Sequence, residues 1–201
     1  MSRIGVFGGT FNPPHLGHLR LAQAAKAQCA LDTVLIMPAN IPPHKQAHDL
    51  VAGDDRLALC RLTFADEGFA VSDLELRRTG KSYTVDTMQA LRDAYPGDEL
   101  FLIIGSDMLL SFDRWYQWQE ILSLCTLIVL SRDDDVSPDA LRMYANETLG
   151  LTEGEGYHVL LLEPMELSST MIRETIRQGS DVSGYLTAPA NAYLKEKGLY
   201  R

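Results

Sequence analysis

The sequence predicts an α/β protein with a single doubly wound, mostly parallel sheet, and two observations lead to this expectation. Short apolar runs alternate with longer helix-like stretches along the chain. Several of these runs, such as residues 33–37 and 100–104, are apolar at every position, which is typical of strands covered on both faces. A repeated strand–helix order makes neighbouring strands parallel, with right-handed crossovers between them.

The elements are predicted from their boundaries as well as their interiors. The strand at 4–7 ends at Gly8-Gly9, and the helix at 16–30 follows Pro13-Pro14, because proline presets φ and has no N–H to lose. Further helices are predicted at 54–66, 84–95, 115–124, 138–149, 170–178 and 189–197, and strands at 33–37, 69–73, 100–104, 126–130 and 157–162. No linker divides the chain, so we predict a single domain over residues 1–201 with C-terminal helices, from about 168 to 201, packed on it.

Composition narrows the classes of protein. With 18 Lys plus Arg and 27 Asp plus Glu, the net charge is 18 − 27 = −9, which disfavours binding to nucleic acid or to an anionic membrane. The three cysteines lie in apolar stretches and form no C-x-x-C, so we expect free thiols and a cytoplasmic location. The most apolar segment is far shorter than the roughly 20 residues of a membrane-spanning helix. A homo-oligomer stays open.

The first strand exit combines glycines, a helix start and two histidines. Glycines let main-chain N–H groups approach a ligand, and a helix N-terminus offers unpaired amides and a positive dipole end. His15 and His18 are three residues apart and project from one side of the first turn. The pattern predicts an anion site in Gly8-Gly9-Thr10-Phe11-Asn12-Pro13-Pro14-His15-Leu16-Gly17-His18.

The same region is compatible with two other structures. A tight turn with two solvated histidines stays open, as does a zinc site made of His15, His18, His44 and His48, which lacks cysteines and a recognised ligand spacing. Gly5, Gly8 and Gly9 do not form G-x-G-x-x-G, and the P-loop glycine that Gly80-Lys81-Ser82 would need is replaced by Glu75.

The last strand exit predicts a second anion site. Hydroxyl residues favour a helix N-cap, and Arg173 lies within one turn of it. Free amides, hydroxyls and a guanidinium therefore converge in Ser168-Ser169-Thr170-Met171-Ile172-Arg173. A well-capped helix without a ligand is the alternative.

These two segments resemble the signatures of the HxGH nucleotidyltransferases, which share a Rossmann-like fold. Further pieces narrow the resemblance to the bacterial nicotinate mononucleotide adenylyltransferase family: Ile41-Pro42-Pro43-His44-Lys45, Lys81-Ser82-Tyr83-Thr84-Val85-Asp86-Thr87-Met88, Ile104-Gly105-Ser106-Asp107 and Trp115-Tyr116. The resemblance runs from near residue 1 to Gly198-Leu199-Tyr200-Arg201. Many relatives carry Asp where this chain has Asn12.

The resemblance implies that ATP and nicotinate mononucleotide give the dinucleotide and pyrophosphate in NAD biosynthesis, with Mg²⁺ carried by ATP and no metal site of the protein's own. It implies catalytic roles for His15, His18 and Arg173. ATP would also meet Gly8, Gly9, Thr10, Phe11, Gly105, Asp107, Ser169 and Thr170. Nicotinate mononucleotide would meet Lys45, Thr84, Trp115, Tyr116 and Arg132.

Two alternatives to this function remain. The same fold acts on other phosphates, such as nicotinamide mononucleotide or phosphopantetheine, although the pantetheine relatives are usually shorter and lack the Thr84 and Trp115-Tyr116 pieces. A nucleotide-sensing regulator would keep the loops without turnover, and the intact His15, His18 and Arg173 argue against it.

Overall fold

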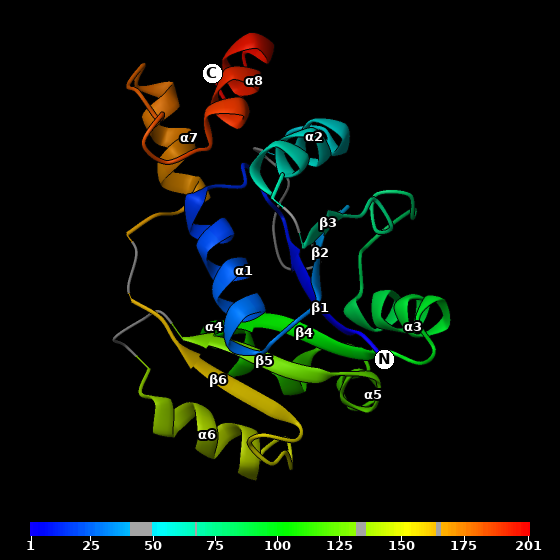
Figure 1. Ribbon diagram of the computed structural model, residues 1–201. Coiled ribbons are helices and arrows are strands. Elements are labelled where there is room, and N and C mark those ends of the chain that lie inside the picture. The colour runs from blue at the N-terminus through cyan, green and yellow to red at the C-terminus, as the bar shows by residue number, and fades with distance from the viewer. Residues whose placement is uncertain (41–49, 67, 132–135, 164–165) are drawn as a thin grey trace. The chain divides into compact units, whose positions relative to one another are not determined.

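One parallel sheet organises the described residues of the computed structural model, which are 1–40, 50–66, 68–131, 136–163 and 166–201. Six strands of this part of the chain lie in the order β3-β2-β1-β4-β5-β6, and β4 pairs in parallel with both β1 and β5, as β5 does with β6. The strands, labelled in Figure 1, are β1 (Arg3–Gly9), β2 (Thr33–Pro38), β3 (Phe69–Val71), β4 (Glu99–Gly105), β5 (Thr126–Ser131) and β6 (Tyr157–Leu161). The predicted doubly wound parallel sheet is confirmed.

The helices follow the predicted order with one error. They are α1 (Leu16–Gln28), α2 (Gly53–Thr63), α3 (Thr84–Ala94), α4 (Ser106–Leu109), the 3₁₀ helix η1 (Phe112–Arg114), α5 (Trp118–Leu124), α6 (Pro138–Glu147), α7 (Ser169–Arg177) and α8 (Ala188–Lys197). The prediction of one helix over 115–124 is wrong at its start. Gln117 has a left-handed φ of 53°, and Trp115 lies before α5, stacked on Phe112 with ring centroids 4.9 Å apart. The short α4 and η1 were not predicted.

The residues that the structure describes group into two compact units. The first unit contains Met1–Phe7, Gln23–Val34 and Tyr83–Met165, and the second contains Gly8–Ala22, Leu35–Ser82 and Glu166–Arg201. The single domain over residues 1–201 stays a prediction.

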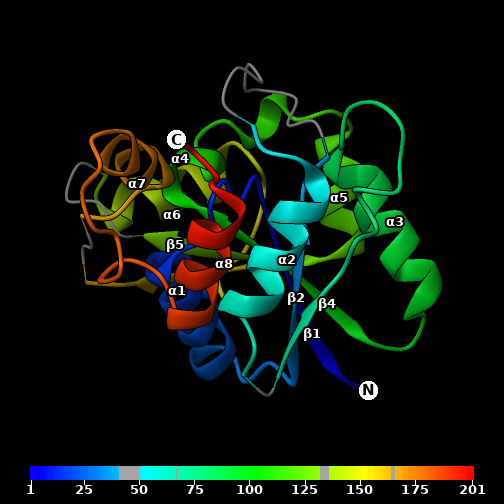
Figure 2. The ribbon, with the colours of Figure 1, turned by 90° about the horizontal axis from the view of Figure 1, so that it is seen from above.

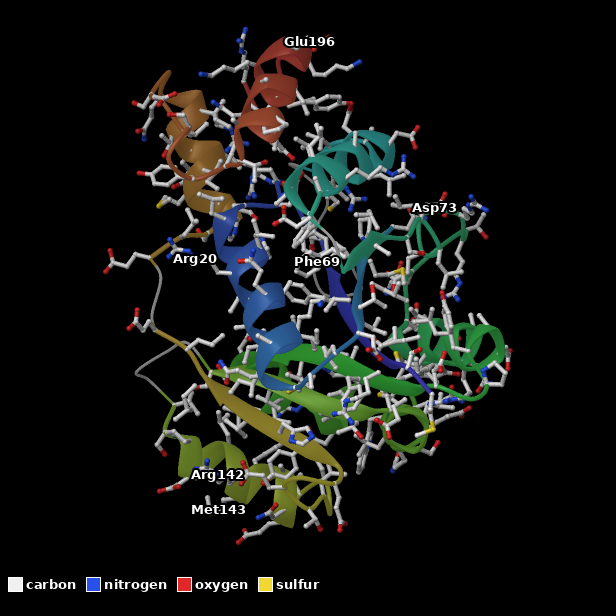
Figure 3. The ribbon with its side chains drawn as sticks, in the orientation of Figure 1. Arg20, Phe69, Asp73, Arg142, Met143 and Glu196 are labelled. Carbon is white, nitrogen blue, oxygen red and sulfur yellow. The ribbon has the colours of Figure 1, made fainter. Side chains whose placement is uncertain are left out.

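Apolar strands and the helix α6 build the first unit. Residues 100–104 of β4 and 127–130 of β5 are buried, and α6 runs along β6 (Figure 1). Ser137 caps α6 by accepting a hydrogen bond from the N–H of Ala140 at 3.2 Å, as the sequence Ser-Pro at a helix start favours. Arg142 and Met143 project from α6 (Figure 3), where the Arg142 guanidinium pairs with Glu153 at 2.9 Å.

Three helices pack together in the second unit. Helices α2 and α8 lie side by side (Figures 1 and 2), and Tyr193 on α8 donates to the Asp55 carboxylate on α2 at 2.8 Å. Helix α7 joins them through the buried Ile172. The shared core consists of Leu59, Ile172, Val182, Leu186, Ala190, Leu194 and Tyr200. Burial of these side chains is what fixes α7, which carries the second predicted anion site, against α2 and α8.

The cysteines are free thiols, as expected. Cys29 and Cys60 are buried and Cys125 is half-buried. Burial raises the pKa of all three, that of Cys125 to about 12, which keeps them protonated and unreactive at neutral pH. In the described residues, no helix combines the length and apolar character needed to cross a membrane.

Candidate active site

The loop that follows β1 is held through its backbone carbonyl groups. The N–H of Ala39 donates to Gly9 O at 2.9 Å, and the guanidinium of Arg56 donates to Thr10 O at 2.8 Å. Gly9 itself has no room for a side chain, because a Cβ there would lie 3.0 Å from the ring of Phe11. Gly8 has open space around it. Of the two glycines, it is therefore Gly9 whose lack of a side chain lets the Phe11 ring pack against the backbone.

Phe11 adopts a strained backbone conformation in this loop. Its φ is 47°, in the left-handed region that non-glycine residues rarely occupy. Burial compensates for the strain, since the ring is 2% exposed and lies edge-on to the rings of His18 and Phe64, with centroids 5.1 and 6.0 Å away. Such strain concentrates where a loop must hold a functional geometry.

His15 and His18 lie together, as their spacing predicted. Their ring centroids are 3.7 Å apart, and each Nδ1 accepts from the other residue's main-chain N–H, at 3.3 and 3.4 Å. This reciprocal arrangement caps the start of α1 much as a capping box does. Because Nδ1 is the acceptor in both rings, Nε2 carries the hydrogen of the neutral imidazole. Each histidine therefore carries its hydrogen as a donor at Nε2.

The second predicted anion site contacts the first through side chains of α7. The hydroxyl of Ser169 donates to Pro13 O at 2.8 Å, and Arg173 Nη1 donates to Asn12 O at 2.9 Å. The nearest following N–H groups are engaged elsewhere, since that of His15 donates to His18 Nδ1 and that of Leu16 donates to Tyr185 O at 2.9 Å. The structure thus brings the two signatures together in the second unit.

Arg173 has one donor left over among the residues that the structure describes. Its Nη2 donates to Thr170 Oγ1 at 3.2 Å, while its Nε is buried without a hydrogen-bond partner. A buried guanidinium N–H without an acceptor is costly, and an anionic ligand would supply one. The Ser169 hydroxyl is engaged by Pro13 O, which leaves the exposed Thr170 as the freer hydroxyl at the helix start.

Asn12 is a junction that the sequence did not reveal. Its Oδ1 accepts from the Tyr200 hydroxyl at 2.9 Å and from the N–H of Val51 at 3.3 Å. Burial raises the pKa of Tyr200, so its hydroxyl stays a donor. An Asn side chain that accepts two hydrogen bonds in this way acts as a structural connection between the loop and the C-terminal segment.

Arg56 is a second residue that sequence reasoning missed. It is 1% exposed, whereas Arg61 of the same helix is exposed. Arg56 shares its face of α2 with the buried Leu59, Cys60 and Thr63. This i, i+3, i+4, i+7 spacing is the signal that could have identified it.

The first unit holds another group of predicted site residues. Gly105 ends β4 and precedes α4. The Asp107 carboxylate folds back over it, so that a Cβ at Gly105 would lie 2.6 Å from Asp107 Oδ1. Asp107 is exposed, and its carboxylate is placed by the turn at the end of β4.

Thr84, Trp115 and Tyr116 form the remainder of this group. Thr84 is the first residue of α3, whose N-cap Tyr83 makes no side-chain capping bond. The Tyr83 ring lies against that of Tyr116, with centroids 5.1 Å apart, and Tyr116 is 59% exposed. The turn that carries Trp115 and Tyr116 is therefore adjacent to a helix N-terminus whose amides suit an anion.

Two predicted site residues, Lys45 and Arg132, lie outside the described residues. So do His44 and His48 of the alternative zinc site. Within the described ranges, no three His, Cys, Asp or Glu side chains are grouped so as to hold a metal ion. The side chains at the loop after β1 are neutral or cationic, which suits phosphate oxygens rather than a bare cation.

Comparisons with known proteins show the family of the chain. A family model described as cytidylyltransferase-like matches residues 6–175. The chain is 39% identical over 211 residues to a protein of Geobacter sulfurreducens named "Probable nicotinate-nucleotide adenylyltransferase", covering 98% of each, and 42% identical to one of the same name from a Synechococcus strain, covering 98% of this chain and 94% of the relative. Among solved structures, the nicotinic acid mononucleotide adenylyltransferase of Plasmodium falciparum, complexed with NaAD, has a similar fold. Its TM-score is 0.80 at 14% identity, covering 100% of this chain and 98% of that one.

Replacing Tyr200 with Phe tests the Asn12 junction. The variant removes one buried hydrogen bond while Asn12 Oδ1 keeps the Val51 N–H, so the free energy of unfolding should fall by about 1 kcal/mol, measured by urea denaturation followed by circular dichroism. Tyr185→Phe, at a residue 37% exposed, is the matched control and should change stability by less than about 0.5 kcal/mol. Equal losses in both variants would contradict the assignment.

Proposed function

The chain belongs to the nicotinate-nucleotide adenylyltransferases, a group within the cytidylyltransferase-like family, and we propose that it transfers the AMP moiety of ATP to nicotinate mononucleotide in NAD biosynthesis. The observation that carries this proposal is the contact of α7 with the loop after β1. Ser169 and Arg173 donate to the Pro13 and Asn12 carbonyls, so two anion-binding helix starts lie at one loop. A triphosphate needs donors at both of its ends.

The reaction needs little acid–base chemistry. A phosphate oxygen of nicotinate mononucleotide forms a bond to the α-phosphorus of ATP, and the bond from that phosphorus to the bridging β-oxygen breaks, releasing pyrophosphate. The second pKa of a phosphate monoester is near ~6, so the nucleophile is already an anion at neutral pH. What the protein must supply is alignment and neutralisation of the charge that develops on the phosphoryl oxygens.

The residues of the second unit have the donors for this task. We assign the Nε2–H groups of His15 and His18 to the α- and β-phosphates, since their Nδ1 atoms are engaged by main-chain N–H groups. The unpartnered Nε–H of Arg173 and the Thr170 hydroxyl are assigned to the β- and γ-phosphates. Main-chain groups of Gly8, Gly9, Thr10 and Phe11 would line the same anion. Ser169 would hold α7 in place through Pro13 O.

A divalent cation, Mg²⁺ in this proposal, would arrive with ATP. The phosphate oxygens are hard ligands that Mg²⁺ prefers, together with water, and the described side chains of this loop include no carboxylate that would compete for it. When bound to the phosphates, the ion offsets their charge and that of the leaving pyrophosphate.

The first unit would recognise the nicotinate mononucleotide. Thr84 and the uncapped N-terminus of α3 suit the nicotinate carboxylate, because helix N-terminal amides bind anions. Trp115 would stack on the pyridine ring beside Tyr116, and Asp107 would bind a ribose or a metal-bound water. Lys45 and Arg132 would contact phosphate, as the family resemblance implies.

A pyrophosphate-release assay with ATP and either mononucleotide tests the function. We expect product with nicotinate mononucleotide and a kcat/KM at least about tenfold lower with nicotinamide mononucleotide, because a site for a carboxylate leaves its donors unpaired with an amide. ATP binding with no product from either mononucleotide would instead identify a nucleotide sensor.

Loss of the His18 donor should lower turnover and spare the fold. His18→Ala should reduce kcat about 10²- to 10³-fold, as removal of one preorganised donor does. His18→Asn is the matched variant, because its amide occupies the place of Nδ1 and preserves the cap of α1 while the Nε2–H is lost. Both should therefore lose kcat, with His18→Asn keeping the wild-type melting temperature in circular dichroism. Normal turnover in His18→Asn would remove His18 from the catalytic group.

Thr84 is expected to govern the choice between acid and amide. Thr84→Ala should lower the ratio of kcat/KM for nicotinate mononucleotide over nicotinamide mononucleotide by about 10- to 100-fold, the effect of one hydrogen bond to a charged group, while KM for ATP stays unchanged. Thr79→Ala, at an exposed position shortly before α3, is the control. An unchanged ratio in Thr84→Ala would exclude Thr84 from the selection of substrate.

A further inference from the structure

Arg56 makes all of its hydrogen bonds to the backbone. Arg56 lies on α2 and is 1% exposed, and its guanidinium donates to four carbonyl oxygens that belong to three separate segments of the second unit. These are Thr10 O at 2.8 Å and Ala39 O at 2.7 Å from Nη1, Asn40 O at 3.3 Å from Nη2, and Val51 O at 3.2 Å from Nε. One side chain therefore connects the loop after β1, the end of β2 and the start of α2.

Burial of the Arg56 guanidinium costs desolvation free energy that an ion pair does not offset. No carboxylate among residues 1–40, 50–66, 68–131, 136–163 and 166–201 forms an ion pair with Arg56, and burial lowers its pKa. An apolar side chain of similar volume often stabilises a protein more than a buried charge does. The guanidinium offers what an apolar side chain lacks, a planar set of N–H groups that reaches several carbonyls at fixed angles.

The carbonyl groups that Arg56 binds determine where neighbouring amides point. In a trans peptide the C=O and the following N–H point in opposite directions. Since Thr10 O faces Arg56, the N–H of Phe11 points away from α2. Gly9 O likewise faces the N–H of Ala39, so the N–H of Thr10 points away from β2. Two successive amides of the proposed phosphate loop thus owe their direction to donors on α2 and after β2.

A second connection runs from Arg56 to Asn12. Arg56 Nε holds Val51 O, and the N–H of the same Val51 donates to Asn12 Oδ1 at 3.3 Å. The main-chain oxygen of Asn12 is the acceptor for Arg173. Arg56 therefore also supports the point at which α7 and its guanidinium are fixed to the loop.

We propose that Arg56 is the positioning residue of the triphosphate site, which orients the amides of the loop after β1 through its carbonyl contacts without touching the substrate. The inference rests on the proposed function only for the identity of the ligand, ATP. It predicts a larger effect on ATP than on nicotinate mononucleotide, because Thr84, Trp115 and Tyr116, three of the residues assigned to the mononucleotide, belong to the first unit.

Arg56→Lys is the primary test, because lysine keeps the charge but has one nitrogen where the guanidinium has three. KM for ATP should rise about tenfold or more, as expected for a misplaced anion site, while KM for nicotinate mononucleotide should change less than about twofold. Arg56→Met, which removes both charge and donors, should have an effect on ATP at least as large. Arg61→Lys and Arg61→Met, at an exposed position of the same helix, are matched controls and should leave both KM values at the wild-type level.

Binding of α,β-methylene-ATP, measured by isothermal titration calorimetry, separates this proposal from the proposed function. If the wild-type protein binds the analogue but forms no dinucleotide from ATP and nicotinate mononucleotide, the proposed activity is wrong, and a tenfold weaker affinity for the analogue in Arg56→Lys still supports positioning by Arg56. Three results would overturn the positioning role of Arg56. They are an unchanged affinity for the analogue in Arg56→Lys, equal changes in both KM values, and a fall in kcat alone that matches the folded fraction of the variant. Failure of Arg56→Lys to fold in circular dichroism would also overturn it, because Arg56 would then be a core residue of general importance.

Discussion

The backbone carbonyl groups of the segment after β1 need donors from outside that segment, and this constraint organises the second unit. Buried main-chain oxygens must be hydrogen-bonded, yet two successive prolines remove local N–H donors from the loop. The structure supplies the missing donors from elsewhere: Arg56 on α2 for Thr10 O, Arg173 for Asn12 O and Ser169 for Pro13 O. The loop is therefore formed together with the helices that hold it.

The same donors give the loop its chemical character. The guanidinium groups of Arg56 and Arg173 donate to carbonyls of this loop, so the loop has two cationic neighbours in a chain whose net charge is −9. A buried cation acts over a longer range than a surface one, because solvent screens it less. In the proposed function, the two guanidinium groups attract the polyphosphate. The acidic remainder of the chain disfavours long polyanions such as nucleic acid.

The elements that sequence predicted well are those whose signal is local. The interiors of β4 and β5 are apolar at each position, and the helices that begin at Pro138 and Ser169 follow the capping residues Ser137 and Ser168. The proximity of His15 to His18 also follows from spacing alone. The helix predicted over 115–124 begins only at Trp118, because a left-handed Gln117 and the stacking of Trp115 on Phe112 separate the two tryptophans. Tertiary contacts there outweighed helical spacing.

The sequence by itself determined the fold class, the family signatures and the two helix starts that are predicted to bind anions, since each depends on residues close together along the chain. Only the tertiary structure decided how those helix starts are joined. The bonds of Arg56 to Thr10, Arg173 to Asn12 and Tyr200 to Asn12 connect residues 46, 161 and 188 positions apart. No periodicity or spacing encodes such pairs, because a buried polar side chain finds its partner through the packing of whole helices.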